Sequence, residues 1–420
     1  MALKDSFRAL RRRSRILVLV LAVVAVVGAA AAVVLLRGGD GKKPVAVLPP
    51  ASGSASTGPV SHRSFLERVT PPPAERTPSG PRVARGVNDL ARRLPLERKI
   101  AQLFIFGFDG KDSSAPIFGD LARLDIGGLA ITSDNYSDPQ QLLALTTAAS
   151  DAAKQQGHVP PWLLTEQDGG DFNELSDLPP ADPPSKIDSI RAAADDAAQT
   201  AAALRQAGIN GVLGPDVDVD TGQGGAYSLL TYSDDPDEVA RFAGVTVQVF
   251  AREKMFVAPK HFPGLGAASQ PTDEGPANVG LSMEQLANRD LVPFKAAFDA
   301  GATGVVLGHG LYSPDEFVTP ASQSSTLATG LLRNNLRFGG VAVTDDLNSP
   351  AITGTQTIPD AAVASIKAGA DMVWISGPSS DQSAAYLAVL NAARRGEIPA
   401  ARIQSALLRI LQTKQELGLI

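Results

Sequence analysis

The stretch DPDEVARFAGVTVQVFAREKMFVAPK, residues 235–260, contains one complete helix-to-strand unit. Asp235 is a residue type that favours a helix start, and apolar residues follow it at helical spacing as far as Arg252. The run from Phe256 to Lys260 is short and largely apolar, which is typical of a buried β-strand. A helix that leads into an apolar strand is the repeating unit of a parallel α/β fold.

The same pattern recurs on both sides of this stretch. Further strand-like runs are residues 103–107, 128–132, 162–165, 211–214, 304–308, 341–344 and 372–376. Helix-like stretches between them include residues 139–156, 190–207, 283–300 and 382–395, with favourable starts at Asp138 and Ser282. Eight apolar strands alternating with helices predict a closed (β/α)₈ TIM barrel of the α/β class, with a doubly wound open sheet as the alternative.

The N-terminal part has a different composition. Residues 16–36 carry no charged or polar side chain and are long enough for a transmembrane helix, whereas a cleaved signal peptide usually has a shorter apolar region. The basic segment 1–15 precedes them, so we expect a single-pass protein of the cell membrane with its catalytic domain outside the cytoplasm. Residues 37–88 are rich in Pro, Ser and Gly and predict a disordered linker, which leaves 89–420 for the barrel.

Charge and cysteine content exclude several classes of function. Residues 1–43 carry a net charge of +7, so the remainder carries −13 for the total of −6. A strongly acidic body repels nucleic-acid backbones, and we expect no nucleic-acid partner. The chain has no Cys, which excludes disulfides, a thiolate zinc site and a cysteine nucleophile.

Polar side chains follow the predicted strands. In a barrel of this type the carboxyl ends of all strands meet at one rim, where active sites lie. A capping role for the next helix is the alternative for any single Asp, but it explains Lys260-His261 and Asp345-Asp346 poorly. The candidate rim residues are Glu166, Asp168, Asp216, Asp218, Lys260, His261, His309, Asp345 and Asp346.

Several of these segments resemble one enzyme family. The resemblance runs in order through KIAQLFIFGF (99–108), YSDDPDEVA (232–240), KHFPG (260–264), VAVTDDL (341–347) and RIQSALLRILQTKQELGLI (402–420). These segments are similar to glycoside hydrolase family 3, and more narrowly to its single-domain bacterial β-N-acetylhexosaminidases, which release terminal N-acetylglucosamine from cell-wall fragments. The resemblance implies a retaining hydrolase of terminal β-linked sugars, such as N-acetylglucosamine or glucose in peptidoglycan or other glycans.

The resemblance also implies roles for individual residues. Asp345 matches the nucleophile at the end of the seventh strand, which forms a covalent glycosyl ester. We expect Asp346 beside it to accept hydrogen bonds from the local backbone. The residues expected to contact the carbohydrate are Glu166, Asp168, Asp218, Tyr232, Lys260, His261 and His309. Tyr232 is a candidate for stacking on a sugar ring, with packing in the core as its alternative. No cofactor and no metal is expected.

The sequence departs from the family pattern at the general acid/base. Where the hexosaminidases have Asp-Ser-His, this chain has Pro271, Thr272 and Asp273, so the imidazole is missing. We expect Asp273, or the adjacent Glu274, to act as acid/base instead. The alternative is a barrel that binds cell-wall sugars with little or no catalysis.

Two further departures lie at the rim, and Lys260 has a second interpretation. The Arg after the third strand is replaced by Asp171, and the Arg of the strand-four loop by Leu230. Losing both guanidinium groups should weaken contacts to substrate hydroxyl or acyl groups. A Schiff base on Lys260 is an alternative from another class of chemistry.

Overall fold

The computed structural model describes residues 84–222 and 224–420. The expected membrane span at residues 16–36 and nearly all of the expected linker at 37–88 lie outside this part of the chain. Within it, no helix combines the length and the apolar character needed to cross a bilayer. Helix α3 (Arg85–Arg93) extends across the expected start of the barrel at residue 89, and Val87 on this helix is buried.

The eight predicted strands are all present and form one parallel sheet. They are β1 (Phe104–Gly107), β2 (Gly128–Ala130), β3 (Trp162–Thr165), β4 (Gly211–Val212), β5 (Phe256–Val257), β6 (Gly304–Leu307), β7 (Val341–Asp346) and β8 (Met372–Ile375). Their order in the sheet is β5-β4-β3-β2-β1-β8-β7-β6. Residues 104–107, 162–165, 304–307 and 372–375 are buried throughout, as expected for strands covered on both faces.

Hydrogen bonds bring the two edges of this sheet together. The amide of Phe262, just after β5, donates to the carbonyl of Val306 in β6 at 2.8 Å, and Val306 N donates to Pro259 O at 3.0 Å. The sheet therefore closes into a ring of eight parallel strands, and the open doubly wound alternative is wrong.

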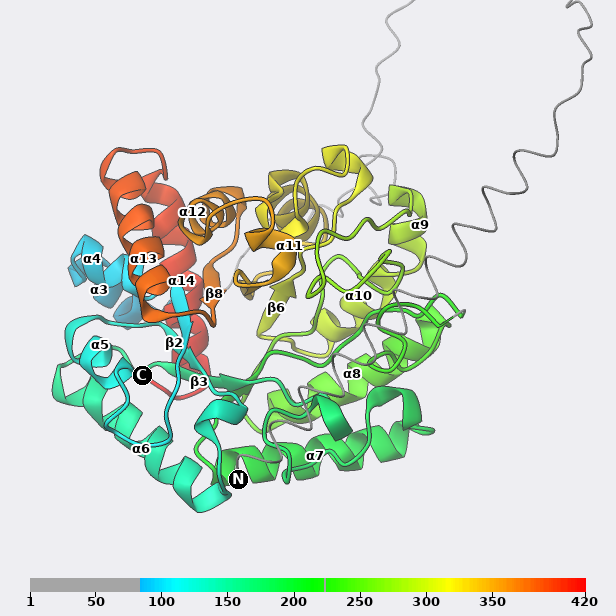
Figure 1. The fold of residues 1–420 in the computed structure, drawn as a ribbon, viewed down its shortest axis with the longest axis horizontal. Helices are drawn as coiled ribbons and strands as arrows, with labels where there is room; N and C mark the ends of the chain where they lie inside the picture. Colours follow the sequence, from blue (N-terminus) through cyan, green and yellow to red (C-terminus); the bar gives the residue numbers. More distant parts are fainter. Residues whose placement is uncertain (1–83, 223) are drawn as a thin grey trace, which may run out of the picture. The chain divides into compact units, whose positions relative to one another are not determined.

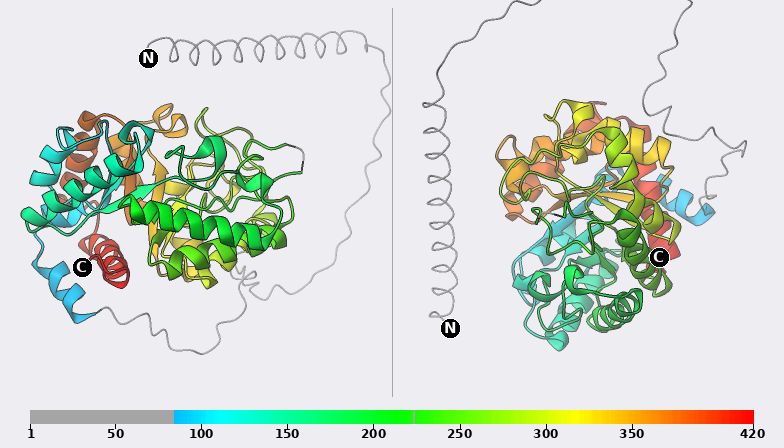
Figure 2. Two further views of the ribbon diagram at one scale, coloured as in Figure 1. Left: turned by 90° about the horizontal axis from the view of Figure 1, so that it is seen from below. Right: turned by 90° about the vertical axis from the view of Figure 1, so that its right-hand side faces the viewer.

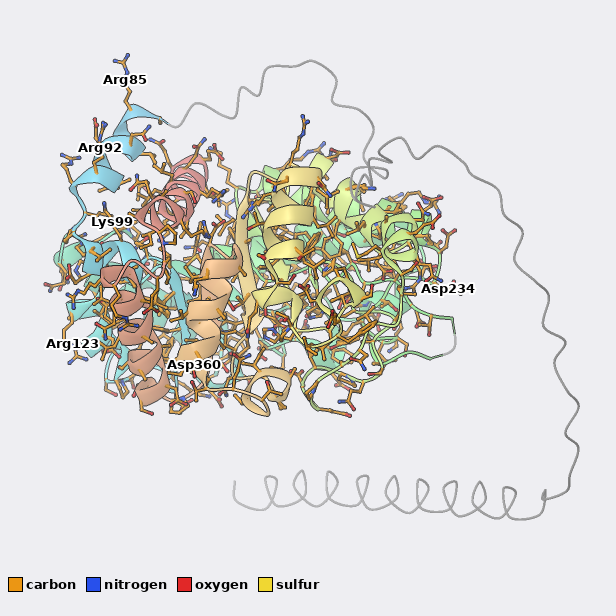
Figure 3. The ribbon with its side chains drawn as sticks, turned by 90° about the horizontal axis from the view of Figure 1, so that it is seen from above. Arg85, Arg92, Lys99, Arg123, Asp234 and Asp360 are labelled. Carbon is orange, nitrogen blue, oxygen red and sulfur yellow. The ribbon has the colours of Figure 1, made fainter. Side chains whose placement is uncertain are left out.

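Helices surround the strands (Figures 1 and 2). They are α4 (Leu96–Ala101), α5 (Ile117–Arg123), α6 (Pro139–Gln155), α7 (Ile190–Gln206), α8 (Pro236–Arg252), α9 (Met283–Asn288), α10 (Leu291–Asp299), the π-helical segment η6 (Thr326–Asn335), α11 (Pro350–Thr353), α12 (Ile358–Ala368), α13 (Ser379–Arg394) and α14 (Ala400–Glu416). Charged side chains such as Arg92 and Arg123 project from the outer surface (Figure 3). The apolar faces of these helices are buried against the strands.

Local sequence explains where several helices begin. The carboxylate of Asp138 accepts hydrogen bonds from the backbone at the start of α6, and Asp235 does the same for α8. Ser282 forms a capping box with Gln285 at the start of α9. The three predicted helix starts are confirmed.

The stretch at 283–300 forms two helices rather than the single helix expected. Pro293 has no N–H, and inside a continuous helix its ring would clash with the carbonyl of residue 289. The chain breaks at Arg289 and Asp290, and α10 then begins with Pro293 in its first turn. Pro293 is thus placed where proline is tolerated.

The last helix, α14, contacts the end of the barrel opposite to the rim. The buried Lys414 amino group donates to the carbonyl of Gly127, just before β2, at 2.8 Å and to the side-chain oxygen of Gln102 at 2.9 Å. Leu407 and Leu411 on the same helix form a small apolar cluster with Val87 on α3. This C-terminal helix is therefore packed against the amino ends of the strands.

Candidate active site

The carboxyl ends of four strands deliver most of the candidate residues to one place. Glu166 follows β3 directly, Asp218 follows β4, Lys260 and His261 follow β5, and Asp345 lies within the last two residues of β7. Because all strands are parallel, these ends lie on the same side of the barrel. Direct contacts between these side chains confirm the predicted clustering.

Lys260 is the centre of a buried three-residue group. Its Nζ donates to Glu166 Oε1 at 2.5 Å and to Asp168 Oδ2 at 2.7 Å. The two carboxylates hold the pKa of Lys260 well above its ordinary value although burial opposes its charge. A protonated amine is not a nucleophile, so this geometry gives no support to a Schiff base on Lys260.

His261 is held by a second carboxylate group. Its Nδ1 donates to Asp218 Oδ2 at 2.8 Å, and the other oxygen of Asp218 accepts from the amide of Leu265 at 2.6 Å. Burial lowers the pKa of His261, but the hydrogen bond to Asp218 and the charges of Asp218, Asp345 and Asp216 outweigh it and raise the value to about 10. His261 is therefore an imidazolium at neutral pH, a donor suited to sugar hydroxyls.

The expected nucleophile lies beside this imidazolium. Oδ2 of Asp345 is 3.9 Å from His261 Nε2, and its Oδ1 accepts from the amide of Asp346 at 2.9 Å. The side chain of Asp345 is 14% exposed, so it is largely desolvated but accessible. Such a carboxylate can attack an anomeric carbon that is placed above the ring of strands.

Asp346 turns the other way and supports the loop. Its Oδ1 accepts from the amides of Asn348 at 3.0 Å and Ser376 at 2.9 Å, and its Oδ2 accepts from the Ser376 hydroxyl. The expectation that Asp346 bonds the local backbone is confirmed. His309 is buried next to Asp346. Its Nε2 donates to the Asp346 carbonyl at 2.9 Å, and its Nδ1 lies 2.9 Å from Ser322 Oγ. His309 thus positions the end of β7 and has both ring nitrogens engaged.

The loop that carries Asp273 is fastened to two neighbouring loops through Thr272. The amide of Thr272 donates to Tyr227 Oη at 2.9 Å, and the two hydroxyls share a hydrogen bond of 3.1 Å. The Thr272 carbonyl accepts from Ser349 Oγ at 2.8 Å and from the Ala351 amide at 3.0 Å. We call these four hydrogen bonds the Thr272 clamp. Its partners lie after β4 and after β7, so the clamp fixes Asp273 next to the loop of the nucleophile.

Two carboxyl groups near Asp345 have raised pKa values. Partial desolvation, and then the negative charge of Asp345, raise the pKa of Asp273, although its side chain is exposed at the loop surface. Burial raises the pKa of Glu166 to about 7, and the charges of Asp168 and Asp345 add to this effect against the opposing charge of Lys260. A raised pKa is what a proton donor near neutral pH requires.

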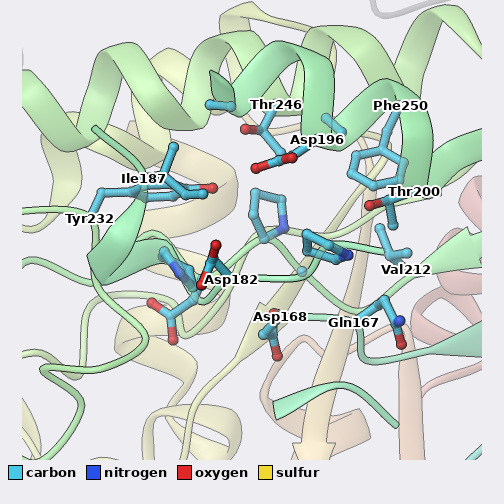
Figure 4. Close-up of a pocket in the computed structure, with 17 residues that line it drawn as sticks. Gln167, Asp168, Asp182, Ile187, Asp196, Thr200, Val212, Tyr232, Thr246 and Phe250 are labelled. Atoms are coloured by element: carbon cyan, nitrogen blue, oxygen red, sulfur yellow. The ribbon is translucent and has the colours of Figure 1, made fainter. Parts of the chain in front are cut away.

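Tyr232 lies in a different environment. Its ring stacks on Phe242 of α8 with centroids 4.8 Å apart, so one face is covered. It lines a cavity of about 50 Å³ that lies between the ends of β3 and β4 and helices α7 and α8. Figure 4 shows Asp196 and Thr246 on one side of this cavity and Asp168 on the other. Tyr232 and Asp168 therefore line the same small cavity. Stacking of Tyr232 on a sugar ring stays a prediction.

Asp216, Asp218 and His261 could in principle hold a metal ion. Their ligand atoms all lie within 4.8 Å of one another, and Oδ2 of Asp216 has no hydrogen-bond partner in the part of the chain that the structure describes. However, Nδ1 of His261 carries the proton that bonds Asp218, and a metal would have to displace this proton. The donor geometry thus favours the hydrogen-bonded pair.

Sequence reasoning missed three positioning residues: Tyr227, Thr272 as a clamp, and Ser349. Tyr227 lies 45 residues from Thr272 along the chain, so no local pattern reveals the contact. The available signal was that Thr272 occupies the centre of the altered acid/base segment. Asp171 is exposed and Leu230 is half-buried, and neither has a cationic side chain to offer.

Comparisons with known proteins agree with the geometry. The glycosyl hydrolase family 3 N-terminal domain profile matches residues 95–413. A β-hexosaminidase of Xylella fastidiosa (strain M23) is 30% identical over 289 residues, covering 66% of this chain and 84% of the relative. A β-hexosaminidase of Xanthomonas campestris pv. campestris (strain B100) is 28% identical over 331 residues, covering 76% and 92%.

Solved structures show the same fold. A family 3 β-N-acetylglucosaminidase from Paenibacillus sp. str. FPU-7 superposes with a TM-score of 0.74 at 28% identity, covering 78% of this chain. This chain spans only 63% of that protein, less than two thirds of its length. A β-N-acetylhexosaminidase from Beutenbergia cavernae DSM 12333 gives a TM-score of 0.69 at 26% identity, covering 77% of this chain and 99% of that one.

Proposed function

Because this chain belongs to glycosyl hydrolase family 3, we propose that it is a retaining glycoside hydrolase that releases a terminal β-linked hexose or hexosamine from cell-wall or other glycans. The observation that carries the proposal is the position of Asp345 at the end of β7, 14% exposed and 3.9 Å from the His261 imidazolium. Lys260 lies in the same site, where it forms an ion pair with the partly exposed Glu166.

The proposed reaction uses two carboxyl groups. Asp345 attacks the anomeric carbon and forms a glycosyl ester, while the protonated Asp273 donates its proton to the departing glycosidic oxygen. Asp273, now ionised, takes a proton from water, whose oxygen attacks the ester and releases the sugar and the Asp345 carboxylate. The raised pKa of Asp273 supports the first step, and the Thr272 clamp supports its placement.

A mechanism-based inhibitor tests the nucleophile. A 2-deoxy-2-fluoro β-glycoside should form a stable ester with the full-length chain, and mass spectrometry should locate the added mass on Asp345. Asp345→Asn should abolish both labelling and turnover of nitrophenyl β-glycosides. Asp151→Asn, on the exposed surface of α6, is the matched control. Binding of glycans without turnover or labelling would instead identify a sugar-binding barrel.

We also propose that residues 16–36 anchor the protein in a membrane with the barrel outside the cytoplasm. The support is the uncharged 21-residue run preceded by Arg11, Arg12, Arg13 and Arg15. The absence of Cys allows a clean test with single-cysteine variants. A membrane-impermeant maleimide applied to intact cells should label Ser56→Cys and not Ser6→Cys. Labelling of both, or loss of residues 1–36 from the mature protein, would refute an uncleaved anchor.

A further inference from the structure

The candidate active site contains more carboxylates than cations. Among the described residues, five carboxylates form ion pairs with only two cations in the site, Lys260 and His261. The carboxylates are Glu166, Asp168, Asp216, Asp218 and Asp345. We call these seven residues the central cluster. Burial raises the pKa of Asp216 well above its ordinary value and that of Glu166 to about 7. Even when these two carboxyl groups are protonated, the other three carboxylates outnumber the two cations, so the central cluster holds excess negative charge.

Part of the excess negative charge of the central cluster is accessible to a ligand. The Glu166 side chain is 26% exposed and Asp345 is 14% exposed, whereas the two cations are nearly covered. Asp216 is fully buried and its Oδ2, 3.7 Å from His261 Nδ1, has no hydrogen-bond partner among residues 84–222 and 224–420. The Lys260 ammonium and Nδ1 of His261 thus bond carboxylates, whereas Nε2 of His261 is 3.9 Å from Asp345 and stays a donor for a ligand, beside the acceptor oxygens of the exposed carboxyl groups.

The departures from the family pattern change charge in the same direction. Asp171 and Leu230 stand where the resemblance has Arg, and Asp273 stands where it has His. Each replacement removes a positive or ionisable basic group from the loops after β3, β4 and β5. The carboxylate of Asp273 also interacts electrostatically with Asp345. At each of these three positions, the chain therefore carries less positive or more negative charge than the family pattern.

We propose that the sugar bound in this site carries a free amino group, so that the preferred substrate class is a β-linked 2-amino-2-deoxyhexoside. This inference rests on the proposed hydrolase function and narrows it. The ammonium group supplies the cation that the central cluster lacks, and it donates up to three hydrogen bonds to carboxylate oxygens. An N-acetyl group at the same position is neutral and donates one hydrogen bond, and a hydroxyl is also neutral.

The protonation of Glu166 is consistent with an unfilled cation position. Burial raises its pKa to about 7, and the charges of Asp168 and Asp345 prevent Lys260 from restoring an ordinary value. An additional cation bound nearby would lower this pKa again, because it stabilises the carboxylate.

Kinetics on three matched substrates test the proposal. The full-length chain is assayed with 4-nitrophenyl β-glucosaminide, β-N-acetylglucosaminide and β-glucoside at pH 6, where the free amine is protonated. We expect kcat/KM for the glucosaminide to be about tenfold or more above kcat/KM for each neutral substrate. One charge interaction at 4–6 Å provides a preference of this size. The preference should shrink as pH rises and the amine loses its proton. Faster hydrolysis of the N-acetyl substrate would overturn the inference.

Binding measurements separate this inference from the proposed catalysis. Calorimetry with glucosamine, N-acetylglucosamine and glucose needs no turnover, so tighter binding of glucosamine would uphold the inference even in an inactive protein. Equal or weaker binding of glucosamine would overturn it even in an active one. Glu166→Gln keeps the shape but cannot ionise when an ammonium binds beside it, so it should reduce the preference for glucosamine about tenfold. Asp151→Asn removes one charge from the exposed surface of α6 and should leave the preference unchanged.

Discussion

Removal of one hydroxyl group should release the loop that carries the proposed proton donor. Tyr227→Phe deletes the oxygen that accepts from the Thr272 amide at 2.9 Å and shares a 3.1 Å hydrogen bond with the Thr272 hydroxyl. Tyr227 and Thr272 are both buried, so water does not readily replace the lost partner. The bonds from Ser349 and Ala351 to the Thr272 carbonyl would remain.

The size of the effect follows from these two hydrogen bonds. Each contributes about 1 kcal/mol, and a buried N–H left without an acceptor adds a further penalty, so the clamped loop should lose about 2–3 kcal/mol. This corresponds to a shift of about 30- to 150-fold toward the released loop. Hydrogen exchange of the Thr272 amide should accelerate by up to that factor, because its rate reports local opening.

Catalysis should respond in a way that depends on the leaving group. With Asp273 displaced, kcat/KM for an alkyl β-glycoside should fall much more than for the nitrophenyl β-glycoside, whose good leaving group needs less protonation. Tyr386→Phe is the control, since this hydroxyl donates to Glu97 O at 3.3 Å between α13 and α4. Unchanged exchange at Thr272, or equal losses on both substrates, would refute the idea that the Thr272 clamp positions a proton donor.

Three further predictions concern single groups. Asp273→Asn should slow alkyl β-glycosides at least tenfold more than nitrophenyl ones, and azide or formate as an added base should restore part of the nitrophenyl rate; a uniform loss would argue against an acid/base role. The pKa of His261 is raised from 6.5 to about 10, so its contribution to the free energy of unfolding is present below pH 6.5 and is lost as pH rises toward 10. The stability difference between wild type and His261→Gln, measured by urea unfolding, should therefore shrink over this pH range. A constant difference would contradict the assignment. Asp371 pairs with three arginines, and Asp371→Asn would leave them around a neutral buried amide. Urea unfolding should show a loss of about 3–5 kcal/mol in the free energy of unfolding. A loss below about 1 kcal/mol would show that these arginines relax into solvent.

Much of the fold could be predicted because its determinants are local. The β-strands are short apolar runs, and a parallel strand buried on both faces leaves this signature in a few residues. Helix starts at Asp138 and Ser282 are also local, since each side chain caps a backbone amide two or three residues later. The break before α10 was missed because the general helical pattern outweighed the single restriction that Pro293 imposes.

The candidate site was predictable only in part. Parallel strands bring their carboxyl ends together, so Lys260, His261 and Asp345 could be assigned to one rim from the order of the strands alone. The resemblance supplied the role of Asp345. The Thr272 clamp could not be predicted, because it joins three loops whose conformations depend on packing and not on a repeating pattern.

The amino-acid sequence by itself determined that eight apolar strands alternate with helices and that ionisable residues follow those strands, because both properties belong to neighbouring residues. The tertiary structure alone decided which carboxylate meets which cation: that Lys260 lies between Glu166 and Asp168, and that His261 bonds Asp218 while it faces Asp345. Electrostatic energies and pKa values depend on distances of a few ångströms between residues far apart in the chain, such as Lys260 and Glu166, which are 94 positions apart. Those distances exist only once the ring of strands has closed.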